Sequence, residues 1–202
     1  MTWDKITVKQ FYEIMEILKE DDGLDPIMSN CRLIDCIWNI SSADISAFRL
    51  SYYLDELKFL QKPYEPKEPK KEYVVNGVTF VPTLDLTKMT TSQYIDFQEL
   101  IKRDDHKHLL NALFIKKGEK YGESDNSDLL WENLSLPDYA DVQFFFLRLW
   151  KKLMTATLTS STKIIKKMCR KEKNKEKKEE MIAQLAAMKT LLLDINEDGL
   201  LG

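Results

Sequence analysis

The sequence predicts a mainly α-helical protein: a duplicated three-helix module with one small β-hairpin between the copies and a long charged C-terminal helix. Three observations lead to this prediction. Only six glycines and six prolines occur in 202 residues, and the composition is otherwise rich in residues that favour helices. One helix-like stretch occurs twice, and a single Asn-Gly pair stands between two β-branched runs.

The repeat begins with residues 5–22, "KITVKQFYEIMEILKEDD", and residues 88–105, "KMTTSQYIDFQELIKRDD", which are identical at seven of eighteen positions. Unrelated stretches of average composition would share about one position. A weaker similarity relates residues 42–60 to residues 139–157, and the fourteen extra residues of the second copy fall in the polar stretch 115–128. An insertion confined to one surface loop is typical of a genuine repeat, so we expect a duplicated module of about three helices.

Both copies start with the pattern of a capped helix. Thr7 lies three residues before Gln10, and Thr90 lies three residues before Gln93. This spacing predicts a capping box, in which the hydroxyl and the amide oxygen each accept the backbone N–H of the other residue. Apolar side chains follow at helical spacing, and each pattern runs as far as an Asp-Asp pair.

Four regions follow from this pattern: a first helical module (1–61), a Pro/Lys linker with the hairpin (62–86), a second module (87–162) and a basic segment with the C-terminal helix (163–202). The prolines of "KPYEPKEPKK" predict an extended connector. Asn76-Gly77 predicts a tight hairpin turn. Because a lone hairpin is marginal in water, we expect it to pack on a helical module or to extend a neighbour's sheet.

The second module contains the most apolar stretch, "VQFFFLRLWKKL" at residues 142–153. Its apolar surface is too wide for a one-sided amphipathic helix, so it predicts a central helix that is buried on most sides. The next stretch, "TATLTSST" at 155–162, has weak helix propensity and predicts a bend or break.

Catalytic signatures are missing from the sequence. It holds no Gly-rich phosphate loop, HExxH, GxSxG or paired CxxC motif, so we expect no enzyme, no cofactor and no metal site. "DDHKH" at 104–108 is interpreted as a solvated helix boundary, because histidines two apart on a helix face different sides. Residues 194–199 match half of a calcium loop without its bidentate glutamate and are interpreted as a polar turn. Cys31, Cys36 and Cys169 are expected to be reduced thiols.

Charge is unevenly distributed along the chain. The formal net charge is −3, yet residues 163–178 carry nine basic and two acidic side chains. An apolar stripe follows within residues 181–195. Candidate contact residues for a protein or nucleic-acid partner are Lys163, Lys166, Lys167, Arg170, Lys171, Lys173, Lys175, Lys177, Lys178, Ile182, Leu185, Met188 and Leu192.

Three interpretations of the basic run stay open. It is a solvated helix without a function, a surface that binds nucleic-acid phosphates, or a surface that binds an acidic protein. The acidic protein can be another copy of this chain. The run has no aromatic residue for base stacking, so we expect any nucleic-acid binding to be non-specific. The N-terminus lacks a signal-peptide pattern, and no run of about 18 apolar residues occurs, so we expect no membrane contact.

Three stretches, "VNGVTFVPTLDLTKMTTSQYIDFQELIK", "HLLNALFIKKGEKYG" and "FFFLRLWKKLMTATL", carry a family resemblance. They resemble small proteins encoded in the virion and assembly gene clusters of tailed bacteriophages, above all phages of gut Bacteroides-type bacteria, including the crAss-like group. The resemblance covers about residues 73–178. It implies either a tail-assembly chaperone or an accessory virion component near the portal and neck, and it transfers no functional residue.

The expected function is therefore that of a non-enzymatic phage structural or morphogenesis protein. It binds other virion proteins as a portal, neck or capsid accessory component, as a homo-oligomer or in several copies in a ring or lattice. One alternative is a cytosolic tail-assembly chaperone that is absent from the mature virion. Another is a non-specific nucleic-acid-binding protein that contacts packaged DNA through residues 163–178. The expected location is the virion or the host cytoplasm.

Overall fold

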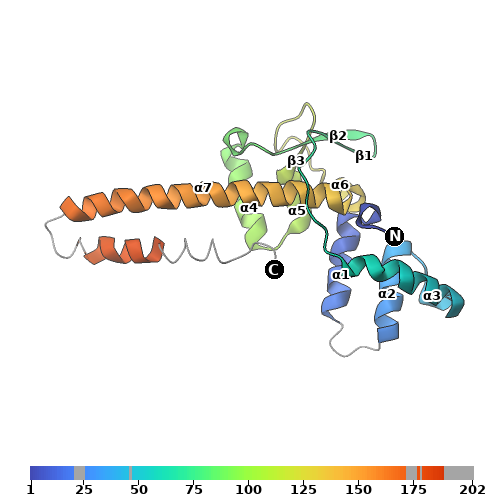
Figure 1. Cartoon of the computed structure of the whole chain (residues 1–202). Coiled ribbons are helices and arrows are strands. Elements are labelled where there is room, and N and C mark those ends of the chain that lie inside the picture. Colours follow the sequence, from blue (N-terminus) through green and yellow to red (C-terminus); the bar gives the residue numbers. More distant parts are fainter. Residues whose placement is uncertain (21–25, 46, 172–176, 178, 189–202) are drawn as a thin grey trace. The chain divides into compact units, whose positions relative to one another are not determined.

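The computed structural model describes residues 1–20, 26–45, 47–171, 177 and 179–188. It is mainly helical and has a small antiparallel sheet of three strands, as Figure 1 shows. The elements in chain order are α1 (Val8–Lys19), α2 (Pro26–Trp38), α3 (Ala47–Glu56), β1 (Tyr73–Val75), β2 (Val78–Pro82), α4 (Thr91–Lys102), α5 (His106–Leu113), β3 (Phe114–Lys116), α6 (Ser127–Asn133) and α7 (Leu136–Lys171). Short 3₁₀ turns lie at Trp3–Lys5, Ser42–Asp44, Leu57–Gln61 and Leu86–Lys88. The chain divides into two compact units, residues 1–144 and 145–202.

The predicted capping box is complete in the first copy of the repeat and half formed in the second. Thr7 Oγ1 accepts the Gln10 N–H at 3.3 Å, and Gln10 Oε1 accepts the Thr7 N–H at 3.1 Å. Thr90 Oγ1 likewise accepts the Gln93 N–H at 3.2 Å. The Gln93 side chain is almost fully buried and makes its own bonds inside the unit, so its amide oxygen does not return to Thr90.

Each of these glutamines joins its helix to the end of the next one. Gln10 Nε2 donates to the carbonyl oxygens of Cys36 and Ile37, both at 3.2 Å, at the end of α2. Gln93 Nε2 donates to the carbonyl oxygen of Ala112 at 2.8 Å, at the end of α5. Helix α1 packs against α2, and α4 packs against α5. Each of the two helix pairs therefore has an equivalent hydrogen bond from a glutamine of its first helix to the end of its second helix.

The weaker half of the predicted repeat differs between the copies. Residues 42–60 form a 3₁₀ turn, the helix α3 and a second 3₁₀ turn, whereas residues 139–157 lie within the single helix α7. The predicted surface loop 115–128 contributes strand β3 and the start of α6. The duplicated three-helix module is thus not confirmed.

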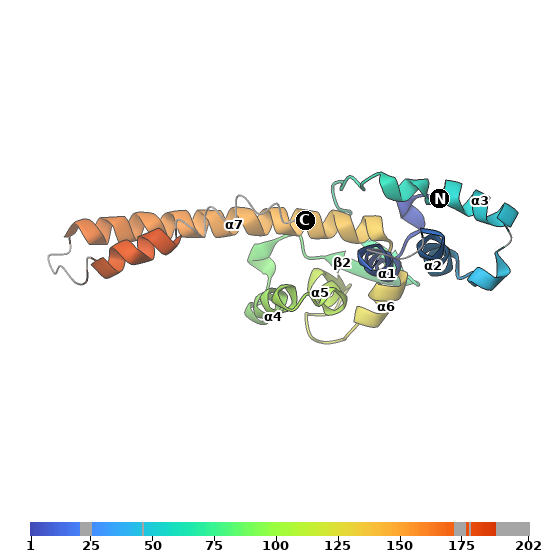
Figure 2. The same cartoon turned by 90° about the horizontal axis from the view of Figure 1, so that it is seen from below.

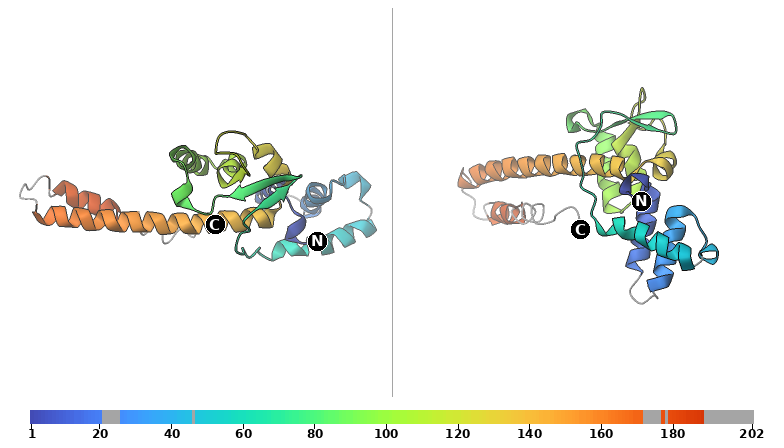
Figure 3. Two further views of the ribbon diagram at one scale, coloured as in Figure 1. Left: turned by 90° about the horizontal axis from the view of Figure 1, so that it is seen from above. Right: turned by 45° about the vertical axis from the view of Figure 1, so that its right-hand side comes forward.

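The predicted hairpin is present and belongs to a larger sheet. Val75 pairs with Val78, and the turn residues Asn76 and Gly77 have φ angles of 48° and 79°, the left-handed conformation that a two-residue hairpin turn requires. Strand β3 pairs antiparallel with β2, with Phe80 opposite Lys116. Figure 3 shows the sheet among the helices of residues 1–144. The third strand supplies the support that a lone hairpin lacks.

The core of residues 1–144 combines side chains from the sheet, the helices and the first residues of the chain. Val8 donates its N–H to the Leu134 carbonyl at 3.0 Å, and Leu136 donates to the Ile6 carbonyl at 2.7 Å, so the N-terminal segment pairs with the segment before α7. The largest fully buried side chains of this unit are those of Tyr139, Phe80, Phe97, Phe114, Ile6, Ile14, Ile34, Leu110, Leu113, Leu130 and Leu134.

The proline-spaced connector has no regular secondary structure and is hydrogen-bonded to the first turns of α7. Asp141 Oδ1 accepts the Tyr64 hydroxyl at 2.8 Å and the Lys67 N–H at 2.7 Å. The Lys70 ammonium group lies 2.6 Å from Asp138 Oδ1. Asp141 is 7% exposed, so these two hydrogen bonds satisfy a carboxylate that burial would otherwise destabilise.

Two predictions about α7 are wrong. The helix continues without a break through the stretch 155–162, because propensity differences of a few tenths of a kcal/mol per residue do not interrupt a long helix. It is also not buried on most sides: Phe146 is fully buried, Phe145 and Trp150 are half-buried, and Phe144 is exposed. In the second unit, residues 179–188 are helical and lie beside the C-terminal part of α7 (Figures 1 and 2).

Candidate functional site

Helix α7 carries the strongest charge asymmetry in the chain. No acidic residue occurs between Asp141 and Glu172, whereas eight basic residues do. The helix has 36 residues, which corresponds to about 54 Å of length at 1.5 Å per residue. Because successive residues are turned by about 100° around a helix, its C-terminal half presents three sides that are roughly 120° apart.

The first side, here called the packed side, faces the helical residues 179–188. It comprises Leu158, Thr162, Ile165 and Cys169, of which Thr162 and Cys169 are buried. The Thr162 hydroxyl donates to Met188 Sδ at 3.9 Å. These contacts make the second unit a two-helix hairpin with a narrow core.

The predicted apolar stripe of the C-terminal segment has three members among the described residues, Ile182, Leu185 and Met188. Leu185 and Met188 are half-buried, as a packed stripe requires, but Ile182 is 52% exposed. Met181 is half-buried instead. The spacing Met181, Leu185, Met188 places three side chains on one side of a helix, and only the partner helix decides which apolar residues form that side.

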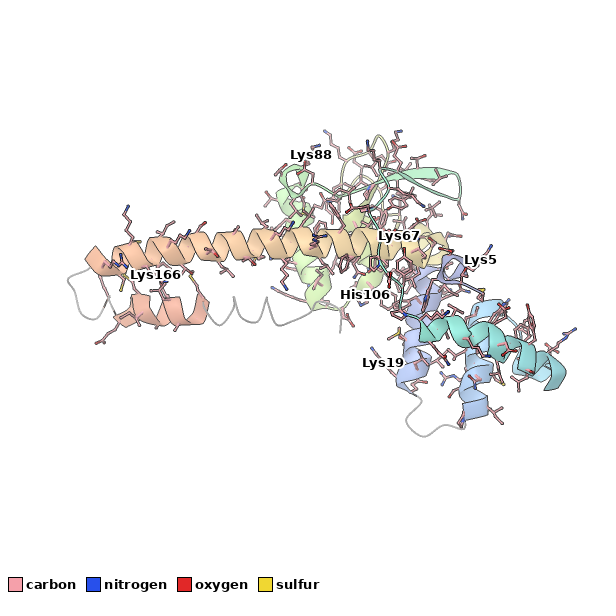
Figure 4. All side chains as sticks on the ribbon, viewed as in Figure 1. Lys5, Lys19, Lys67, Lys88, His106 and Lys166 are labelled. Carbon is pink, nitrogen blue, oxygen red and sulfur yellow. The ribbon has the colours of Figure 1, made fainter. Side chains whose placement is uncertain are left out.

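The second side, here called the basic face, gathers cations from most of the helix. It comprises Arg148, Lys152, Lys163, Lys166, Lys167 and Arg170, all of which are exposed. Figure 4 labels Lys166 on α7. None of the six forms an ion pair within the part of the chain that the structure describes. Thr155 and Thr159 lie on the same side, between the two groups of cations.

Four of the predicted contact residues, Lys163, Lys166, Lys167 and Arg170, therefore come together on this face. Lys171 ends α7, and Lys177 is exposed beyond it. Lys173, Lys175, Lys178 and Leu192 lie outside the described residues, as do the turn at 194–199 and its calcium-loop pattern. Sequence reasoning missed Arg148 and Lys152. The available signal was their spacing of four residues in an acid-free stretch.

The third side, here called the apolar row, becomes more exposed along the helix. Its apolar members are Phe146, Trp150, Leu153, Ile164 and Met168, and Thr157 lies on the same side between Leu153 and Ile164. The rings of Phe146 and Trp150 stack with centroids 6.5 Å apart. Phe146 is fully buried, whereas Leu153, Ile164 and Met168 are 43%, 59% and 51% exposed. Three large apolar side chains thus face solvent on one side of the helix.

A polar groove of about 760 Å³ lies between α1 and α2 in the first unit. The Cys36 thiol lies 3.5 Å from Glu13 Oε2 at this groove. Burial and the neighbouring Glu13 carboxylate raise the pKa of Cys36 to about 12, so the thiol stays protonated and is a poor nucleophile near neutral pH. Among the described residues, no three His, Cys, Asp or Glu side chains gather to hold a metal ion, and the three cysteines are free thiols.

The two histidines of "DDHKH" have different neighbours. Asp105 caps α5 by accepting the His108 N–H at 3.1 Å, and its carboxylate also meets the His108 ring. His106 is half-buried, and its Nε2 lies 2.7 Å from Asp104. The helix boundary is as predicted, but the His106 ring is packed rather than solvated.

An aromatic stack joins α1 to the later helices of the first unit. The Tyr12 ring lies between His106 and Trp131, at centroid distances of 4.3 and 5.2 Å. Its hydroxyl lies 3.4 Å from that of Tyr139. Burial raises the pKa of Tyr12 to about 12. This stack connects helices of the first unit, and within it His106 Nδ1 is buried without a hydrogen-bond partner among the described residues.

Comparison of the chain with protein-family models, with curated proteins and with solved structures returns no match. In the described part of the chain, no helix combines the length and the apolar character that crossing a bilayer requires.

Proposed function

We propose that this chain is a non-enzymatic structural or morphogenesis protein of a tailed-phage particle, and that it binds other virion proteins in several copies. The observation that carries this proposal is the apolar row of α7. A row of exposed large apolar side chains on a helix is a common recognition surface, in which the helix lies in a partner's apolar groove. The phage setting rests on the sequence resemblance.

Energetics support a partner for the second unit. Its two packed helices have a narrow core, and a unit of about 60 residues buries only about 60% of the surface that its unfolded chain exposes and is therefore marginally stable. Full burial of one large aliphatic or Met side chain contributes about 1.5–3 kcal/mol. Because Leu153, Ile164 and Met168 are about half exposed, a partner that covers them gains several kcal/mol in total.

The proposal includes two further features of the architecture, a duplicated helical module and a charged C-terminal interaction arm. A duplicated helical module is supported by the two caps at Thr7 and Thr90 and by the two glutamines that reach the end of the next helix. The charged C-terminal segment from residue 163 acts as an interaction arm. Its described part is the end of α7 and the helical residues 179–188.

The test compares two double variants of the full chain. Ile164→Gln with Met168→Gln makes the apolar row polar, and Ile95→Gln with Ile101→Gln removes two exposed isoleucines from α4 as the matched control. Each variant is produced in infected cells, and its amount in purified particles is measured by mass spectrometry beside its thermal stability. We expect the row variant to keep its melting temperature and to be lost from particles, and the control to be incorporated.

Two results would change the conclusion. Normal incorporation of the row variant would contradict binding through the apolar row. Absence of the wild-type chain from purified particles, together with its co-purification with a tail protein from infected cells, would assign the chaperone role instead.

A further inference from the structure

The basic face of α7 points to a second partner class. We propose that it binds the phosphate backbone of double-stranded nucleic acid without reading the base sequence. The inference goes beyond the proposed function and does not depend on it, because a different side of the helix carries it. The two surfaces can be inactivated separately.

Charge patterning on α7 is unlike that of a solvated helix. Solvated helices place opposite charges three or four residues apart, and like charges at four residues destabilise a helix by about 0.2–0.5 kcal/mol per pair. Three such like-charged pairs lie on the basic face: Arg148 with Lys152, Lys163 with Lys167, and Lys166 with Arg170. The stretch 142–171 contains no carboxylate to offset them. An anion from outside the chain therefore stabilises this helix.

The face has the length and the donors that a duplex backbone requires. From Arg148 to Arg170 it extends about 33 Å at 1.5 Å per residue. Phosphates on one strand recur about every 3.4 Å along the axis, so this length corresponds to roughly one turn of duplex. Thr155 and Thr159 add hydroxyl donors between the cations, and Ser and Thr hydroxyls are frequent phosphate contacts.

Sequence-independent binding follows from what the face lacks. No aromatic side chain occurs between Trp150 and the end of the described residues, so no base can stack on the C-terminal half of α7. Between Arg148 and Arg170 the apolar residues on this face are Leu149 and Ala156, whereas protein interfaces have a larger apolar core. The apolar row of α7 lies on another side. These features favour phosphates over the acidic surface of a second copy as the occupant.

The experiment measures binding of the full chain to a fluorescent 30-base-pair duplex of mixed sequence by anisotropy, at several salt concentrations. The face variant replaces Lys152, Lys163, Lys166 and Arg170 with Gln. Its matched control replaces Lys5, Lys19, Lys67 and Lys88 with Gln; all four belong to the first unit and are labelled in Figure 4. Both variants change the net charge by the same amount.

We expect the wild-type chain and the control to bind with a logarithmic salt slope of about −3.6 to −4.5, which corresponds to four or five phosphate contacts. The face variant should bind at least about tenfold more weakly, with a slope near −1. A second duplex of unrelated sequence should bind equally well. A triple variant, Lys152→Arg with Lys163→Arg and Lys166→Arg, should still bind the duplex. Because it keeps the three charges, it distinguishes loss of charge from an effect of side-chain replacement on folding.

If the face variant and the control lost affinity for the duplex equally, net charge alone would explain the binding, and the proposal would be overturned. Failure of the wild-type chain to bind either duplex at low salt would also overturn it. Salt-sensitive self-association in sedimentation velocity, lost in the face variant and not accompanied by duplex binding, would identify a second copy as the occupant.

Discussion

Residues 1–144 and residues 145–202 differ in how they use their apolar side chains and their charges. The first unit buries large side chains from the sheet and from most of its helices, whereas the buried residues described in the second are Phe146, Thr162 and Cys169. The first unit carries 17 basic and 26 acidic side chains, a net charge of −9; the second carries 13 and 7, a net charge of +6. The first unit buries most of its large apolar side chains, and the described part of the second leaves several of them exposed.

This difference indicates which part of the chain is the scaffold. In the first unit, buried polar groups such as Gln93 and Asp141 are hydrogen-bonded within the unit. In the second unit, the exposed sides of α7 carry either cations or large apolar groups, and neither kind completes a core. Surfaces with these properties are expected where binding, rather than folding, determines the residues.

The largest expected effect tests where the core lies. Phe80 lies on the central strand β2, and its side chain is fully buried. Phe80→Ala should therefore lower the free energy of unfolding by about 3–5 kcal/mol. Met168→Ala, on the exposed apolar row, should change it by less than about 0.5 kcal/mol. Urea unfolding followed by circular dichroism measures both. Similar losses in the two variants would show that α7 contributes to the core as much as the sheet does.

An intermediate effect tests the two related glutamines. Gln93→Leu removes the amide that donates to the buried Ala112 carbonyl and should cost about 1–3 kcal/mol. Gln10→Leu should cost less, because Gln10 lines the open polar groove and water can replace it. Chemical denaturation compares the two variants directly. A larger loss at Gln10 would contradict this difference in burial.

A smaller effect on stability is expected from truncation. Deleting residues 164–202 should change the free energy of unfolding of residues 1–144 by less than about 1 kcal/mol, because their core is complete without that segment. The same deletion should abolish incorporation into particles or oligomers. Thermal unfolding and sedimentation velocity measure the two properties. Assembly kept with stability lost would make the segment part of the scaffold.

A pH dependence of stability is expected in the first unit above about pH 10. The phenol of Tyr12 has a pKa of about 12 in the folded chain and ordinarily 10.0, so the unfolded state loses this proton first. Stability from this group is fully present below pH 10 and falls between about pH 10 and 12. Tyr12→Phe should make the free energy of unfolding fall less steeply with pH between about pH 10 and 12. The difference in slope should correspond to one proton. Identical slopes in the two proteins would place Tyr12 in solvent.

Local sequence patterns predicted several elements correctly, because their causes lie within a few residues. Thr7 and Gln10 define the start of α1 through bonds three residues apart, and Asn76-Gly77 defines the hairpin turn. Strand β3 was missed because Phe114–Lys116 is too short to show an alternating pattern. Its register depends on β2, which is more than thirty residues away.

The sequence by itself determined the charge of α7 and the starts of several helices, since net charge and capping depend on residue identity and local spacing. Tertiary structure decided which side of α7 is packed, because the helical residues 179–188 cover Thr162 and Cys169 and leave Ile164 and Met168 exposed. It also left Ile182 exposed and joined Arg148 and Lys152 to the later cations in one uninterrupted helix. Helical periodicity in the sequence is compatible with more than one packed side of α7. The packing of residues 179–188 on α7 determines which side is covered.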